Sequence, residues 1–150
     1  VHFDIVGGGD QRKNLEHLAA ELGVQDRVTF HGRVSDDELR ELYSRASVFT
    51  IASIAELQSI ATMEAMASAL PIVGANAVAQ PHLVHDGENG YLFEPGDVDD
   101  LADKLTRVLT ASPEEYERMQ QASLDGVAVH DINRTLDTFE ALYRDEKLPE

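Results

Sequence analysis

The chain has 150 residues, a size typical of one domain, and 43% of them are apolar, which is enough for a buried core. Its 28 acidic and 12 basic residues give a formal net charge of −16, which repels nucleic-acid phosphates and anionic membranes. There is no cysteine, so disulfides and thiol chemistry are excluded. No apolar run approaches the roughly 20 residues of a membrane span. A nucleic-acid-binding role is therefore not expected.

Strands and helices are expected to alternate along the chain. Short, apolar, β-branched runs predict strands at residues 1–6, 28–30, 48–51, 72–74 and 91–93. Helical periodicity and capping signals predict helices at residues 11–22, 35–45, 59–69 and 97–109, with further helices beginning at 112 and 131. Such alternation implies an α/β fold with a doubly wound, Rossmann-like parallel sheet and right-handed crossovers.

Local residues define several helix ends. Ser35 and Glu38 have the spacing of a capping box, and Ser112 and Glu115 repeat it with Pro113 at the first helical position. Asp97 and Asp131 are expected to cap the two helices that begin beside them.

Two carboxylates lie eight positions apart at a strand-to-helix junction. Glu56 falls in the loop after the strand 48–51, and Glu64 falls in the second turn of the helix 59–69. In open α/β sheets, ligands bind at the carboxyl ends of the strands. The helix N-terminus adds unpaired N–H groups and a partial positive charge at the same place. Acids beside an anion site suit a ligand with both phosphates and hydroxyls, which indicates a nucleotide sugar.

These residues resemble the donor-binding motif of the retaining glycosyltransferases of family 4, which have the GT-B fold. The resemblance consists of the Glu56–Glu64 pair followed by EAMASALPIV at 64–73, with other segments of the family in the same order. Those segments are IVGGG at 5–9, DRVTFHGRV at 26–34 and LVHDGENGYLF at 83–93. The match covers residues 1 to about 110, and linked motifs in one order are far more specific than the acid pair alone.

The resemblance implies that residues 1–150 are a nucleotide-sugar-binding C-terminal domain that lacks its first βα unit, with C-terminal helices from about 111 to 150. The chain begins inside a strand without an initiator Met, as a piece of a longer protein would. The Arg and Lys that usually grip the diphosphate would lie upstream of Val1, and the N-terminal domain would supply the other wall of the cleft. The fragment alone is therefore expected to be inactive.

The resemblance also implies residue roles at the junction. Glu64 would accept hydrogen bonds from the two ribose hydroxyls, and the catalytic Glu56 would orient the donor sugar through one of its hydroxyls. Backbone N–H groups of Gln58, Ser59 and Ile60 would face the sugar and diphosphate.

Two other segments are assigned to the nucleotide through the resemblance. Gly8 and Gly9 would bring backbone close to it, although three adjacent glycines alone are typical of a tight turn and do not form a dinucleotide fingerprint. Arg33 and Val34 would contact the base, although this segment alone could also be an ordinary loop.

The implied reaction moves a hexose from a nucleoside-diphosphate sugar to an acceptor hydroxyl, with retention of configuration. No cofactor and no metal are expected, because these enzymes usually stabilise the diphosphate with side chains and the six histidines are scattered. The expected partners are the nucleotide-sugar donor, the missing N-terminal domain and an acceptor that is a glycan, a lipid or a small molecule. The expected location is the cytoplasm, with attachment at the membrane surface through the missing domain as a variant.

Two other functions stay open, and departures from the family pattern leave the identity of the donor sugar undetermined. Residues 57–59 replace a glycine-containing turn, and residues 78–82 replace a loop that is often glycine-rich. The alternatives are a non-catalytic nucleotide-binding or regulatory module and a sugar-nucleotide epimerase of the same architecture. The presence of both acids argues against the first, and the helix sequence 64–71 is not the mark of the second.

Overall fold

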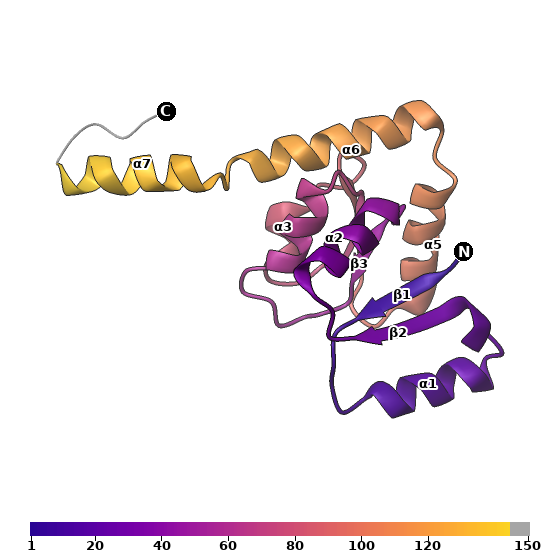
Figure 1. Cartoon of the computed structure of the whole chain (residues 1–150). Coiled ribbons are helices and arrows are strands. Elements are labelled where there is room, and N and C mark those ends of the chain that lie inside the picture. The colour runs from indigo at the N-terminus through magenta and orange to yellow at the C-terminus, as the bar shows by residue number, and fades with distance from the viewer. Residues whose placement is uncertain (145–150) are drawn as a thin grey trace. The chain divides into compact units, whose positions relative to one another are not determined.

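A computed structural model describes residues 1–144 (Figure 1). The chain forms two compact units, one of residues 1–45 and one beginning at Ala46, and each is described by itself. Strands and helices alternate as far as residue 109, two further helices follow, and every strand pair is parallel. The predicted parallel α/β fold is confirmed.

The first unit is a two-stranded parallel sheet with helices on its connections. Its elements are β1 (Phe3–Val6), α1 (Arg12–Glu21), the 3₁₀ turn η1 (Gln25–Arg27), β2 (Val28–Gly32) and α2 (Asp36–Arg45). Phe3 pairs with Val28 in the sheet, and α1 packs along β2 (Figure 1). The capping box at the start of α2 forms as predicted, with the Ser35 N–H donating to Glu38 Oε2 at 2.8 Å.

The apolar face of α1 is only partly covered. Ala19 is buried, whereas Leu15, Leu18 and Leu22 are 43%, 47% and 66% exposed. A two-stranded sheet offers too little apolar surface to bury a full helix face, so α1 contributes less hydrophobic stabilisation than its sequence pattern would allow.

The second unit is a three-stranded parallel sheet in the order β3-β4-β5. Its elements are β3 (Phe49–Ile51), α3 (Ile60–Ala67), β4 (Ile72–Ala75), α4 (Gln80–Leu83), β5 (Gly90–Phe93), α5 (Val98–Leu109), α6 (Pro113–Ala128) and α7 (Ile132–Tyr143). Every residue of β4 is buried, as expected for the central strand of a sheet with helices on its connections.

Two clusters of contacts hold this sheet. A core formed by Val73, Phe93, Val108 and Met119 joins β4 and β5 to α5 and α6. Elsewhere α3 packs against α6, and the Ser123 hydroxyl donates to the Leu70 carbonyl at 2.8 Å inside the contact. The long helices α5 and α6 thus pack against the central strand β4, and the turn after β4 contacts the loop of the candidate site.

The helix starts of this unit follow the local signals. Asp97 accepts from the Asp100 N–H, Ser112 and Glu115 form a full capping box, and Asp131 caps α7. The one-turn helix α4 is not predicted by the sequence, which indicates no helix between the strands at 72–74 and 91–93. Within residues 1–144, no helix combines the length and the apolar character needed to cross a membrane.

Candidate functional site

The loop between β3 and α3 places Glu56 where the sequence predicts it. Glu56 is half-buried and belongs to the loop that runs from Ile51, the last residue of β3, to Ile60, the first residue of α3. Its carbonyl oxygen accepts a hydrogen bond from the Ala79 N–H at 3.2 Å. The loop is therefore tied to the turn that follows β4, at the carboxyl edge of both strands.

Glu64 lies in the second turn of α3, as predicted, and its side chain is exposed. Its carbonyl oxygen accepts from the Ser68 N–H at 3.0 Å and from the Ser68 hydroxyl at 2.9 Å. Both acids therefore belong to one continuous loop-and-helix segment, with the N-terminal turn of α3 between them. Such a turn presents N–H groups that have no partner within the helix.

The three residues predicted to offer backbone groups differ in burial. Ser59 is 1% exposed and immediately precedes α3, whereas Ile60 is 64% exposed and Gln58 is exposed. The Ile60 N–H donates to the Gln58 carbonyl at 3.1 Å, so it would have to change partner to meet a ligand.

A buried polar chain lies beneath this turn and was not predicted. The Ser59 and Thr62 hydroxyls are 2.7 Å apart, and the Thr62 hydroxyl donates to Gln80 Oε1 at 3.2 Å. Thr62 and Gln80 are fully buried. No sequence signal links them, because Gln80 belongs to the segment that departs from the family pattern.

The turn before Gln80 contains a strained residue. Val78 has φ +46°, a left-handed conformation that β-branched residues rarely adopt. The strain costs roughly 1–3 kcal/mol and persists only where surrounding contacts impose it. The family pattern often has glycine in this loop, and glycine adopts a positive φ without strain. Val78 has the same kind of backbone conformation although it is not glycine.

In the first unit, the glycine loop and the segment after β2 lie at one sheet edge. The Gly7 N–H donates to the Gly32 carbonyl at 2.8 Å, which joins the ends of β1 and β2. The candidate residues Gly8, Gly9 and Arg33 are exposed, and Val34 is half-buried. The structure thus brings the two predicted nucleotide segments together within this unit.

Arg12 adds a positive charge at the same edge and was not predicted. One guanidinium nitrogen donates to the Phe30 carbonyl at 2.9 Å, and the group lies 5.9 Å from the centre of the Phe30 ring. A further bond joins it to Glu16 at 2.7 Å. A Cβ at Gly32 would lie 3.2 Å from this guanidinium, so the arginine packs closely on the turn that leads to Arg33.

An ion-pair cluster stabilises β1 and β2. His31 Nε2 lies 2.6 Å from Asp4 Oδ1, and Arg45 lies 3.8 Å from the same oxygen. The hydrogen bond with His31, with a smaller contribution from Arg45, holds the pKa of Asp4 below its ordinary value. In the described part of the chain, no group of His, Asp or Glu side chains is arranged to hold a metal ion.

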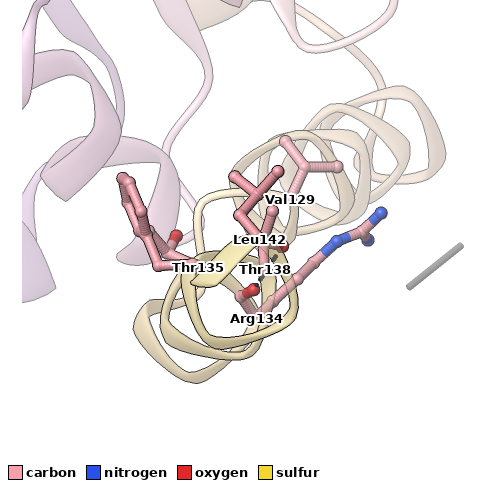
Figure 2. Close-up of a pocket in the computed structure, with 6 residues that line it drawn as sticks. Val129, Arg134, Thr135, Thr138 and Leu142 are labelled. Carbon is pink, nitrogen blue, oxygen red and sulfur yellow. Dashed lines mark hydrogen bonds between the residues drawn. The ribbon is translucent and has the colours of Figure 1, made fainter. Parts of the chain in front are cut away.

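A hollow of about 190 Å³ opens elsewhere, along α7 (Figure 2). Its lining residues are Val129, Arg134, Thr135, Thr138, Phe139 and Leu142. The Thr138 hydroxyl is used by the helix itself, since it donates to the Arg134 carbonyl at 2.8 Å. None of the predicted site residues lines this hollow, so it is not the candidate site.

Many proteins with a parallel α/β fold bind phosphorylated ligands at the edge where the strands end and helix N-termini begin. The family model described as glycosyl transferases group 1 matches residues 1–125. The chain therefore belongs to that family.

Relatives and solved structures agree with this assignment. The chain is 37% identical over 137 residues to a D-inositol 3-phosphate glycosyltransferase of Mycolicibacterium vanbaalenii, a match that covers 91% of this chain and 30% of the relative. It is 45% identical over 120 residues to an MMP alpha-(1->4)-mannosyltransferase of Mycolicibacterium hassiacum, covering 79% of this chain and 29% of the relative. The chain thus spans about a third of the length of these curated relatives or slightly less.

Solved structures show the same fold. Sucrose-phosphate synthase from Thermosynechococcus elongatus superposes with a TM-score of 0.84 at 29% identity, covering 95% of this chain and 37% of that one. Anabaena HepE in complex with UDP and glucose superposes with a TM-score of 0.82 at 25% identity, covering 96% of this chain and 41% of that one. These similarities confirm the Rossmann-like α/β fold class of GT-B glycosyltransferases.

Proposed function

We propose that the chain is the donor-binding, C-terminal domain of a longer retaining glycosyltransferase. This enzyme would move a hexose from a nucleoside-diphosphate sugar to an acceptor hydroxyl. The observation that carries the proposal is the placement of Glu56 at the carboxyl edge of β3 and of Glu64 on α3, on either side of a helix N-terminus. Family membership and the UDP-bound structure of a similar protein support it.

In this proposal, different residues bind different parts of the donor. Glu64 accepts hydrogen bonds from ribose hydroxyls, and a carboxylate suits two neighbouring hydroxyls because it offers acceptors only. Glu56 orients the sugar through a hydroxyl, while Gln58, Ser59 and Ile60 face the sugar and diphosphate with backbone N–H groups.

The first unit would meet the nucleotide. Gly8 and Gly9 let the backbone approach it, and Arg33 and Val34 lie beside the base. Side chains from the remainder of the protein stabilise the leaving diphosphate, and no metal or other cofactor is proposed. The fragment alone would then bind donor weakly and would not turn it over.

The cytoplasm is the proposed place of reaction. A sequence without cysteine is compatible with that compartment. The proposed partners are the N-terminal domain of the same protein and an acceptor that is a glycan, a lipid or a small molecule.

The test is a transfer assay on the full-length protein. Nucleoside-diphosphate sugars that differ in base and hexose are offered with acceptors that include inositol 3-phosphate, the acceptor class in a relative's name. The expected result is release of nucleoside diphosphate that requires one donor and one acceptor, with a product whose anomeric configuration matches the donor by NMR. Donor binding without turnover would indicate a regulatory module instead. Interconversion of nucleotide sugars without an acceptor would indicate an epimerase.

A further inference from the structure

The side chain of Gln80 is fully buried at the start of α4 and is incompletely hydrogen-bonded. Its Oε1 accepts from the Thr62 hydroxyl at 3.2 Å, while its Nε2 has no hydrogen-bond partner among residues 1–144. A buried donor without a partner opposes folding, because its hydration is lost and not replaced. An apolar side chain of similar volume would stabilise the core more, because it has no donor to leave unpaired. Stability alone therefore does not account for a glutamine here.

The strand beneath Gln80 leaves room for this side chain. A Cβ at Gly74, in β4, would lie 3.0 Å from Gln80 Oε1 and 3.3 Å from its Cγ. Any other residue at position 74 would therefore crowd the Gln80 side chain, which would have to shift by a few tenths of an ångström. The absence of a side chain in the buried strand allows the amide to reach α3.

Through Thr62, the amide reaches Ser59, the candidate-site residue that immediately precedes α3. Thr62 uses its single hydroxyl proton toward Gln80, so the Ser59 hydroxyl donates to Thr62 across 2.7 Å. The preceding residue, Ala79, donates its N–H to the Glu56 carbonyl at 3.2 Å. Two consecutive residues thus fix both ends of the segment from Glu56 to Ser59.

We propose that Gln80 is a positioning residue of the donor site. Through the Thr62 and Ser59 hydroxyls it holds the first turn of α3, and the Ala79 backbone holds Glu56 in register with that turn. The inference rests on the proposed function, because the segment that it positions is the one assigned to the donor sugar. Gln80 touches no donor atom itself.

The decisive variant is Gln80→Leu in the full-length protein, with Gln121→Leu on the exposed face of α6 as a matched control. Gln80→Leu removes the unpaired buried donor, so the melting temperature should stay the same or rise. The kcat/KM for the donor sugar should nevertheless fall about 10-fold or more, since small displacements of reacting groups have effects on that scale. Affinity for the free nucleoside diphosphate should fall by less than kcat/KM, because only the contacts of the first turn of α3 with the diphosphate are loosened and no sugar is present to be misplaced.

Variants of Thr62 test the route. Thr62→Val should reproduce the loss of kcat/KM. Thr62→Ser, which keeps the hydroxyl, should have a normal kcat/KM. The double variant Gln80→Leu/Thr62→Val should be no worse than either single variant, because residues that act through one chain are not additive. Additive losses, or a normal kcat/KM with a lowered melting temperature, would overturn the proposal and leave Gln80 a packing residue.

Amide hydrogen exchange separates this inference from the function on which it rests. Gln80→Leu should raise the exchange rates of the Ile60 and Met63 amides, which donate to the Gln58 and Ser59 carbonyls, about 10-fold, the change expected where local opening becomes easier, while amides in α5 stay unchanged. If the wild-type protein transfers no sugar, the proposed function fails, and the exchange rates still decide the positioning. Unchanged exchange at Ile60 and Met63 would refute the positioning even in an active enzyme.

Discussion

Replacing Gly90 with alanine should disrupt the sheet that carries the candidate site. Gly90 pairs with Ile72 in the β4–β5 register and has φ +152°. A Cβ at this position would overlap the carbonyl group and the backbone nitrogen of Ile72. Since β4 is buried on all sides, its backbone has no free space into which to move.

The cost can be compared with that at Gly87, a second glycine of the same turn. Gly87 has φ +78° and no atom within 4 Å of an added Cβ, so Gly87→Ala should cost only the left-handed conformation, about 1–2 kcal/mol. Gly90→Ala adds displacement of β4 and loss of the 3.0 Å bond from the Ile72 N–H to the Asn89 carbonyl. A total of about 4 kcal/mol or more is expected, a large part of the roughly 5–15 kcal/mol that stabilises a domain.

Urea unfolding followed by circular dichroism measures both variants against the parent chain. The expected order of stability is parent, Gly87→Ala, then Gly90→Ala, with Gly90→Ala partly unfolded before urea is added. A loss at Gly90 within about 1 kcal/mol of the loss at Gly87 would refute the close β4–β5 approach.

Three further predictions concern other parts of the chain. In the full-length protein, Glu64→Ala should lower the affinity for the free nucleoside diphosphate by about 10-fold or more, which is the scale of charged hydrogen bonds. An unchanged affinity by calorimetry would contradict the ribose role. Val78→Gly should leave the melting temperature unchanged or raise it, because relief of roughly 1–3 kcal/mol of strain exceeds the entropic cost of glycine, and a clear fall would contradict the strain. The pKa of Asp4 is lowered chiefly by its hydrogen bond with His31, so the stability that this carboxylate supplies is present at neutral pH and is lost as pH falls below about 4. Between pH 7 and pH 2 the melting temperature should therefore fall more steeply for the parent than for Asp4→Asn. An equal dependence on pH in both proteins would contradict that link.

The features predicted correctly from the sequence depend on residues that are close together in the chain. The capping box at Ser112 forms as expected because Glu115 is three residues away. Glu56 and Glu64 occupy the predicted loop and helix because the apolar strand before them and Pro71 after them limit what the intervening chain can form.

The features that were missed depend on contacts between distant residues. Thr62 and Gln80 are 18 positions apart, and a threonine inside an apolar helix gives no sign of a buried partner. The helix α4 has only four residues, with Pro81 in its first turn, so periodicity could not indicate it. The exposure of Leu18 on α1 was also not predictable, because the amphipathic pattern does not tell how much surface the two-stranded sheet provides.

Kinetics of Glu56→Gln in the full-length protein test the central claim, that the two acids hold one nucleotide sugar, most directly. The substitution keeps the size of the side chain and removes its charge. Turnover should fall about 10²-fold or more, because Glu56 positions the sugar for reaction, while affinity for the free nucleoside diphosphate should hardly change. Normal turnover together with a lowered melting temperature would show that Glu56 only stabilises the loop, and would contradict the account.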